Sequence, residues 1–196
     1  MRADVSSLRP FNEDVQLTFS GSPHTFDKAI VCAGAYSARL LKPLNFDLPL
    51  MAERGYHLNL STIRTLIQGP VCSAERNVFI SPLDGGLRIV GFSELGGLDL
   101  PAVPARYETL KHHLGALLPQ TLAHLGSATE WMGKRPTLPD SLPVIDTLPD
   151  APQIGVAFGH QHAGVTLAAI TSTLIADRLL KQAEHLDLAA YTLARF

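Results

Sequence analysis

The sequence predicts a mixed α/β or α+β fold, arranged as one domain or a small pair of domains. Three features predict it: short apolar runs of the strand type, one amphipathic helix near the middle, and a strand, turn and helix towards the C-terminus. The chain has 196 residues, of which 46% are hydrophobic and 17% are charged. This composition is sufficient for a buried core and excludes an intrinsically disordered chain.

The first fifty residues predict a β-hairpin followed by a short helix. Residues 15–19 alternate between apolar and polar side chains, residues 21–23 are typical of a turn, and residues 29–33 form a second candidate strand. This second run is apolar almost throughout, which is typical of a strand buried on both faces. A short helix is expected over residues 37–41, ending at Pro43.

The middle of the chain predicts an antiparallel sheet and a helix. Residues 56–60 alternate as a strand does, and residues 78–80 and 87–90 flank the turn residues 84–86, which include two glycines. Residues 105–118 place apolar side chains on one face of a helix.

The last third begins with four prolines between residues 136 and 149, which predict an extended loop. Residues 154–158 then predict a short buried strand, Gly159 begins a tight turn, and a helix is expected over residues 164–181. Small side chains on this helix predict close packing against a neighbouring sheet or a ligand. They are Ala168, Ala169, Ser172 and Ala176.

Charge and motifs exclude several functional classes. Sixteen Lys and Arg residues against eighteen Asp and Glu give a formal net charge of −2, and the basic residues are scattered. We therefore expect no nucleic-acid partner and no polybasic membrane contact. A G-x-S-x-G motif, a P-loop and a Ser-His-Asp order are missing, so nothing supports a serine hydrolase or nucleotide-phosphate chemistry.

The cysteines and the apolar segments predict a cytoplasmic protein. Cys32 and Cys72 are far apart in the sequence and are expected to be reduced, buried thiols, with a disulfide as the alternative. Residues 1–5 contain no apolar segment, so we expect no secretory signal. Residues 154–180 are apolar but interrupted by polar and charged side chains, so they are not expected to span a bilayer.

Several residues are candidates for binding chemistry. The N-terminus of the helix after Gly159 and Gly164 could bind an anion, because unpaired backbone amides point out of it, although many buried helices begin in the same way. His160 and His162 lack the third ligand that a zinc site needs, so we expect no metal. Arg135 could hold a carboxylate through two parallel hydrogen bonds.

The remaining candidates have equally ordinary alternatives. The plainest alternative for Arg135 is a contact with solvent or with Asp140. Tyr56 and His57 are adjacent in a strand, so they face opposite sides and only one of them can point into a cleft.

Four segments occur in an order that is typical of one family. They are VCAGAYS (31–37) with LLKPL (40–44), RGYHL (54–58), GKRPTLPDSLPVI (133–145) and AFGHQHAGVTL (157–167). In this order they resemble the C-terminal half of FAD-dependent D-amino acid dehydrogenases, within the wider superfamily of D-amino acid oxidase and glycine oxidase.

The resemblance implies oxidative deamination of D-amino acids such as D-alanine, with a hydride passing from the substrate Cα to N5 of FAD. It implies that Arg135 holds the substrate carboxylate and acts by positioning, with no side-chain base, and that Tyr56 or His57 lines the substrate cavity. Backbone amides of the C-terminal turn would face the flavin and favour the negative charge that develops there. The cofactor-binding residues implied in this way are Ala33, Gly34, Gly159, His162, Ala163, Gly164, Val165 and Thr166.

By the same resemblance, the fold combines an incomplete FAD-binding domain of the glutathione-reductase type with a substrate domain built on an antiparallel sheet. Residues 1–45 and 131–196 would belong to the FAD-binding domain, and residues 46–130 to the substrate domain. The dinucleotide fingerprint G-x-G-x-x-G, which such enzymes carry in an N-terminal βαβ unit, is absent from the sequence. We therefore expect about half of the enzyme, including its N-terminal FAD-binding half, to be missing.

This absence has physical consequences. The strands at residues 31–33 and 156–158 would lack neighbours in their sheet, which leaves apolar surface and open edges. We expect the polypeptide alone to bind FAD poorly and not to oxidise D-alanine. Two alternatives stay open: an amine oxidase acting on glycine, sarcosine or a D-proline derivative, and a non-catalytic truncated fragment. The expected electron acceptor is a respiratory one such as a quinone, which leaves peripheral association with the inner face of the cytoplasmic membrane open.

Overall fold

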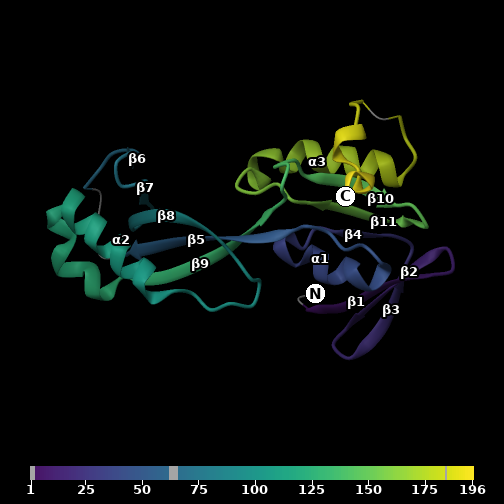
Figure 1. Cartoon of the computed structure of the whole chain (residues 1–196), viewed down its shortest axis with the longest axis horizontal. Helices are drawn as coiled ribbons and strands as arrows, with labels where there is room; N and C mark the ends of the chain where they lie inside the picture. Colours follow the sequence, from purple (N-terminus) through teal and green to yellow (C-terminus); the bar gives the residue numbers. More distant parts are fainter. Residues whose placement is uncertain (1–2, 62–65, 184) are drawn as a thin grey trace. The chain divides into compact units, whose positions relative to one another are not determined.

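The computed structural model describes residues 3–61, 66–183 and 185–196, which form two compact units (Figure 1). The first unit comprises Met1–Ala52 and Arg135–Phe196, and the second comprises Glu53–Lys134. Two strands, β5 (Met51–Leu60) and β9 (Thr129–Thr137), contribute residues to both units. The mixed α/β fold with antiparallel sheets that the sequence predicts is confirmed.

The first unit contains two three-stranded sheets. One is an antiparallel sheet in the order β1-β2-β3, and the other has the order β10-β11-β4, in which β10 and β11 are antiparallel and β11 and β4 are parallel. The strands are β1 (Val5–Phe11), β2 (Asp14–Phe19), β3 (Ser22–Phe26), β4 (Ala29–Val31), β10 (Val144–Leu148) and β11 (Ala151–Phe158). The α-helices are α1 (Ser37–Leu41) and α3 (Gly164–Leu179), with 3-10 turns at Gly34–Tyr36, Lys42–Leu44, Ala189–Tyr191 and Leu193–Arg195.

These elements form three layers around the β10-β11-β4 sheet. On one face of that sheet, Val156 and Phe158 of β11 pack with Leu41 of α1 and with apolar side chains of β1 and β2. On the other face, Ala157 of β11 packs against Ile175 and other residues of α3. Figure 1 shows this order, from α3 through β10 and β11 to α1 and β1. The alternation of side chains along β11 therefore buries both of its faces.

The predicted hairpin is wrong in its second strand. Strand β2 pairs with β3 rather than with β4, and the connection is a two-residue turn at Ser20 and Gly21, whose φ angles are 52° and 76°. Two successive positive φ values match the twist of a tight hairpin, so residues 22 and 23 lie in the next strand instead of the turn. Strand β4 belongs to the other sheet, where it runs parallel to β11.

The proline-rich stretch is also more regular than the sequence indicates. Strand β9 extends through Pro136, and β10 begins directly after Pro143, so only a short connection between them lacks strand structure. The prolines lie at the end of one strand and just before the start of another, where a missing amide donor costs the sheet little. The strand predicted at residues 154–158 and the helix predicted from residue 164 are confirmed as β11 and α3.

The second unit is a five-stranded sheet in the order β6-β7-β8-β5-β9, packed against one long helix. The predicted hairpin is confirmed, because Leu83 pairs with Gly86 across the turn residues Asp84 and Gly85. The predicted helix is confirmed with bounds one residue earlier at each end. Besides β5 and β9, the second unit contains β6 (Val71–Ser73), β7 (Val78–Leu83), β8 (Gly86–Gly96), α2 (Pro104–Leu117) and a 3-10 segment at Pro119–Ser127.

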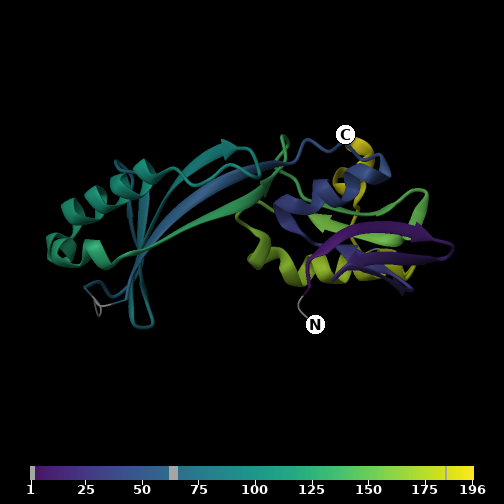
Figure 2. The same cartoon turned by 90° about the horizontal axis from the view of Figure 1, so that it is seen from below.

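One face of this sheet is covered by α2 (Figure 2). Tyr107, Leu110 and Leu114 of α2 are buried against Leu58 and Ile89 of the central strands. Burial of this apolar face stabilises the unit by about 1.5–3 kcal/mol for each large side chain that is fully buried. The opposite face of the sheet carries polar and aromatic side chains.

Three expectations about individual side chains need correction. Cys32 and Cys72 are both free, but both are exposed, because each lies in or next to an outer strand of its sheet. Residues 29–33 are not buried on both faces, since Ile30 is 45% exposed. The small residues of α3 do not pack closely against a sheet: Ala168 and Ser172 line a hollow beside β4 instead.

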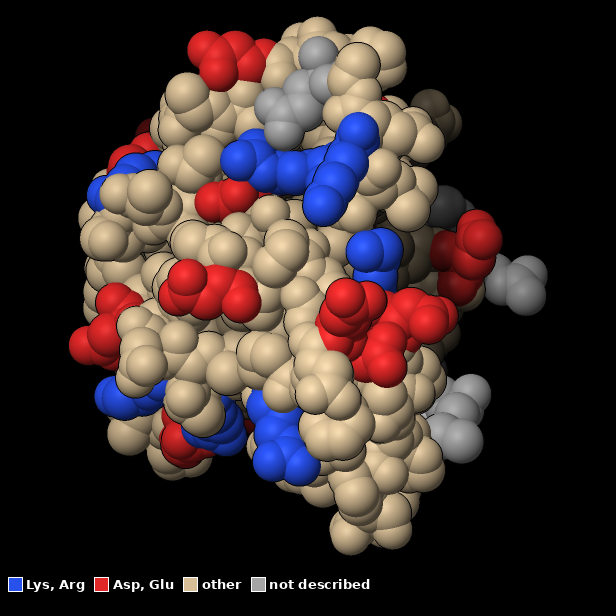
Figure 3. All heavy atoms as spheres, turned by 90° about the vertical axis from the view of Figure 1, so that its right-hand side faces the viewer, with Lys and Arg blue, Asp and Glu red and all other residues tan. Residues whose placement is uncertain are grey.

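The charged side chains are interspersed on the surface. On the face drawn in Figure 3, acidic and basic groups alternate with uncharged surface, which agrees with the net charge of −2. Among the helices of the described ranges, none has both the length and the apolar content needed to cross a membrane.

Candidate functional site

The turn between β11 and α3 is built around Gly159. This glycine has a φ of +87°, and a Cβ atom added to it would lie 2.5 Å from Cδ1 of Leu138 and 3.5 Å from Cα of Pro143. The position thus needs both left-handed backbone and the absence of a side chain. The chain turns sharply here and begins α3 five residues later, at Gly164.

Replacing Gly159 with alanine is expected to lower the free energy of unfolding by about 2–3 kcal/mol, because the new methyl group adds steric overlap to backbone strain. Urea unfolding followed by circular dichroism measures this change. The matched control is Gly69→Ala, a site where an added Cβ meets nothing within 4 Å. Equal stability of the two variants would contradict the assigned role of the Gly159 turn.

His160 fastens this turn to the helix that follows it. Its Nε2 atom lies 2.9 Å from Oγ1 of the buried Thr171, and burial lowers the pKa of the imidazole. His162 is exposed. Within the described ranges, no group of three or more His, Cys, Asp or Glu side chains is arranged to hold a metal ion.

The N-terminus of α3 is open to the surroundings. Its N-cap residue, Ala163, makes no side-chain hydrogen bond to the first turn. Val165, in the first turn of the helix, is 93% exposed. A Cβ added at Gly164 would meet only Cβ of His160, at 3.7 Å. The amides of the first turn are therefore accessible to an acceptor, and the helix dipole favours negative charge there.

The end of strand β9 lies directly beside this turn. The backbone amide of Gln161 donates a hydrogen bond to the carbonyl oxygen of Pro136, with an N···O distance of 3.2 Å. Arg135, the residue before Pro136, is half-buried and belongs to the same unit as the turn. Asp140, the alternative partner of Arg135, is bound instead by Arg195, whose Nε lies 2.7 Å from Oδ2.

Tyr56 and His57 face opposite sides of β5, as the strand alternation predicts. Tyr56 is fully buried on the face that packs against α2. Its hydroxyl donates to Oε2 of Glu94 at 2.8 Å and accepts a hydrogen bond from the amide of Val103 at 3.3 Å. Because both functions of this hydroxyl are used inside the second unit, we retain only His57 as a candidate for contact with substrate.

Glu94 holds this buried polar group together. The Tyr56 hydroxyl lowers the pKa of the Glu94 carboxyl most, and the guanidinium groups of Arg54 and Arg106 lower it further. The Arg54 Nη2 atom lies 2.9 Å from Oε2 of Glu94, and its Nη1 atom donates to the carbonyl of Pro101 at 2.8 Å. This network joins β5, β8 and the segment before α2, and its role is structural.

A second group, which the sequence does not reveal, lies on the other face of β5. The His57 ring stacks on the Trp131 indole, with centroids 4.6 Å apart and planes at 17°. Asn59 bridges His57 to Arg88, which lies on β8. The group combines residues from three strands, so no local sequence signal could have found it.

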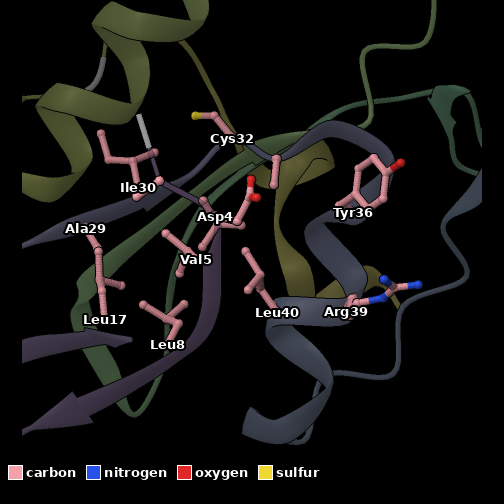
Figure 4. A pocket seen from close by; sticks show the side chains of 13 residues that line it. Asp4, Val5, Leu8, Leu17, Ala29, Ile30, Cys32, Tyr36, Arg39 and Leu40 are labelled. Atoms are coloured by element: carbon pink, nitrogen blue, oxygen red, sulfur yellow. The ribbon is translucent and has the colours of Figure 1, made fainter. Parts of the chain in front are cut away.

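The end of β4 opens onto a large hollow in the first unit. Ala33, Cys32 and Tyr36 line a cavity of about 660 Å³ together with apolar side chains of β1, β2 and α1 (Figure 4). A second hollow, of about 310 Å³, is lined by Ile30, Cys32, His160 and Gly164, with side chains of α3. Gly34 has a φ of +55°, and an added Cβ would meet nothing within 4 Å.

Strand β4 separates these two hollows and has one open edge. Within the described ranges it pairs only with β11, so its other edge presents unpaired backbone groups beside exposed Ile30. An edge strand flanked by apolar hollows is the surface that a further strand would cover. The expected open edge of an incomplete sheet is therefore present at β4. The same expectation for residues 156–158 is wrong, because β11 is the central strand and pairs with β10 on one side and with β4 on the other.

Comparison with known proteins decides the family of this chain. The model of the DAO family, described as "FAD dependent oxidoreductase", matches residues 2–178. The chain belongs to the FAD dependent oxidoreductase family. The resemblance drawn from the sequence is confirmed at this level, and so is FAD as the cofactor of the family.

The relatives of this DAO-family chain include two curated proteins and a solved structure. A D-amino-acid oxidase from Bradyrhizobium diazoefficiens is 32% identical over 87% of the chain, and a D-amino acid dehydrogenase from Phenylobacterium zucineum is 35% identical over 87%. Glycine oxidase from Geobacillus kaustophilus superposes with a TM-score of 0.82 at 25% identity and covers 99% of the chain.

The chain is much shorter than these relatives. It covers 41% and 40% of the two curated proteins, and 52% of the glycine oxidase chain. The DAO-family chain thus spans about two fifths of the curated relatives that it matches. Strand β4 and its open edge lie within the part that matches the family.

Proposed function

We propose that this DAO-family chain supplies the C-terminal, substrate-holding portion of a FAD-dependent enzyme that oxidatively deaminates D-amino acids such as D-alanine. The observation that carries the proposal is the hydrogen bond from Gln161 to Pro136, because it fixes the strand that bears Arg135 beside the turn that opens α3. A cation for a carboxylate and a set of accessible amides thus occur together in the first unit.

Arg135 is proposed to hold the substrate α-carboxylate. A planar guanidinium can donate two parallel hydrogen bonds to a carboxylate, which fixes both the position and the orientation of the substrate. Arg135 is half-buried at the end of a strand, where its backbone is held by the sheet. Its contribution to the reaction is positioning, and no side-chain base on Cα is assigned.

The residues present fit one part of FAD. The uncapped first turn of α3 and the open space at Gly164 suit a planar group with hydrogen-bond acceptors at its edge. His162, Ala163, Gly164, Val165 and Thr166 are proposed to hold this part, with Gly159 shaping the turn, and Ala33 and Gly34 to lie beside the dinucleotide at the end of β4. When bound, FAD supplies the two-electron acceptor for the substrate's Cα hydride.

The rest of the cofactor site is proposed to come from the N-terminal half of the enzyme, docked at the open edge of β4. The chain carries no G-x-G-x-x-G fingerprint, so it lacks the glycine-rich turn that binds the pyrophosphate in dinucleotide-binding folds. The two hollows that flank β4 provide the apolar surface for such a contact. A respiratory acceptor such as a quinone is proposed to receive the electrons.

A substrate panel tests the proposed reaction. The chain is co-expressed with the remaining, N-terminal part of the Phenylobacterium D-amino acid dehydrogenase, which it would complete. D-alanine-dependent reduction of a dye, with no reduction by L-alanine, is the expected result. Reduction by neither enantiomer in a complex that carries FAD would contradict the proposal.

The similarity to glycine oxidase favours a second candidate, oxidation of a small amine such as glycine or sarcosine. This reaction keeps the roles of Arg135 and of the α3 turn, because glycine and sarcosine also carry a carboxylate. The same panel separates the two candidates, since preference for glycine, sarcosine or D-proline over D-alanine would select the second.

A further inference from the structure

The sheet face of the second unit that α2 does not cover carries a connected polar and aromatic group. We define the open-face cluster as Trp131 on β9, His57 and Asn59 on β5, and Arg88 on β8. Asn59 lies in contact with Arg88, and Glu53 of β5 accepts a hydrogen bond from Ser93 of β8. Asn59 lies near the C-terminal end of β5, whereas Glu53 lies near its N-terminal end. Glu53 is therefore at the far end of β5 from Arg88.

Arg88 lacks a counter-charge on this face. Its Nε atom donates to Oδ1 of Asn59 at 2.8 Å, and within the described ranges no carboxylate lies within ion-pair distance of its guanidinium. Arg88 is half-buried at a central strand of the sheet, between Ser81 on β7 and Asn59 on β5. The two terminal NH₂ groups are thus available as a forked donor in partly desolvated surroundings.

The neighbours of Arg88 are held in a defined arrangement. Because the Asn59 oxygen accepts from Arg88, its amide nitrogen faces Nε2 of His57, 3.4 Å away. Burial lowers the pKa of His57 and the charge of Arg88 lowers it further, which favours the neutral form of the ring. The ring in turn supports the Trp131 indole, which is 55% exposed. Gly133 makes room for this indole, since a Cβ there would lie 2.0 Å from it.

We propose that the open-face cluster is a binding site for a small organic carboxylate, in which Arg88 pairs with the anion and Trp131 covers its apolar part. A carboxylate supplies the missing counter-charge and matches the two free NH₂ groups in geometry. The exposed indole favours an organic anion over inorganic phosphate, because it offers apolar surface next to the cation. The cluster belongs to the second unit, whereas Arg135 belongs to the first.

The chain contains a single tryptophan, so its fluorescence reports on this face alone. The chain is titrated with glutarate at constant ionic strength, maintained with sodium chloride, and in parallel with inorganic phosphate. A saturable change in Trp131 emission with glutarate, and at least tenfold weaker binding of phosphate, is the expected result. No saturable change, or equal binding of phosphate, would overturn the proposal.

Two variants locate the site. Arg88→Met is expected to weaken glutarate binding at least tenfold, whereas Arg76→Met removes one positive charge elsewhere in the unit and is expected to leave it unchanged. Asn59→Asp keeps the size of the side chain but places a carboxylate beside Arg88, so it should abolish binding in a folded chain. Wild-type affinity in folded Arg88→Met or Asn59→Asp would overturn the proposal. These measurements need neither FAD nor turnover, so their failure would leave the proposed reaction untouched.

Discussion

Replacing Arg135 with alanine is expected to lower kcat/KM for D-alanine by about 30- to 1000-fold, with most of the change in KM. The reason is the loss of a forked, charge-assisted contact with the substrate carboxylate, which is worth about 2–4 kcal/mol in a site shielded from water. Because the chain spans only part of its relatives, the measurement is made on the complex with the N-terminal half. Steady-state dye reduction at varied D-alanine concentration gives both constants.

Two further variants make this result specific. Lys134→Ala removes the neighbouring positive charge, whose side chain alternates to the other side of β9, and it is expected to change kcat/KM by less than about threefold. Arg135→Lys keeps the charge but loses the planar fork, so its KM should lie between those of the wild type and Arg135→Ala. An unchanged KM in Arg135→Ala would remove the assignment of this residue.

Replacing Asp146 with alanine is expected to lower the free energy of unfolding by about 3–5 kcal/mol. Asp146 is 7% exposed in β10, and its carboxylate joins three parts of the first unit. Oδ1 lies 3.0 Å from Nε of Arg178 in α3 and accepts from the amide of Thr147, while Oδ2 accepts from the amide of Leu193 at 2.8 Å. Removal of this carboxylate leaves the amide of Leu193 without its acceptor. It also removes a negative charge that pairs with the guanidinium of Arg178.

Urea unfolding measures this loss, with Asp150→Ala as the matched control. Asp150 is exposed in the turn after β10, so its replacement is expected to change stability by less than about 0.5 kcal/mol. A loss below about 1 kcal/mol in Asp146→Ala would show that the C-terminal segment and α3 are held by apolar packing alone.

The sequence predicted the elements whose local signals are strong. The hairpin of β7 and β8 follows from the glycines of its turn, and α2 follows from apolar side chains at helical spacing. Strands β1 and β3 were not predicted, because most of their side chains are exposed and the apolar alternation is missing. The partner of β4 could not be predicted either, since parallel pairing with β11 joins residues more than 120 positions apart.

The residues of the candidate site could likewise be predicted where a local motif marks them, and not where their position depends on long-range contacts. The turn after β11 and Arg135 were identified from local motifs, and the hydrogen bond between Gln161 and Pro136 brings them together. The burial of Tyr56 was not predictable, because alternation says that Tyr56 and His57 face opposite sides but not which side α2 covers. The contacts of Arg88 depend on the order of strands in the sheet, which no local pattern specifies.

Flavin content tests the central claim most directly, namely that this chain holds one part of a FAD site and needs the other half to complete it. The chain is purified alone and after co-expression with the N-terminal part of the Phenylobacterium relative, and the flavin spectrum is compared with the protein concentration. We predict far less than one FAD per chain for the chain alone, and close to one FAD per chain in the complex. One tightly bound FAD per chain in the chain alone would contradict this account.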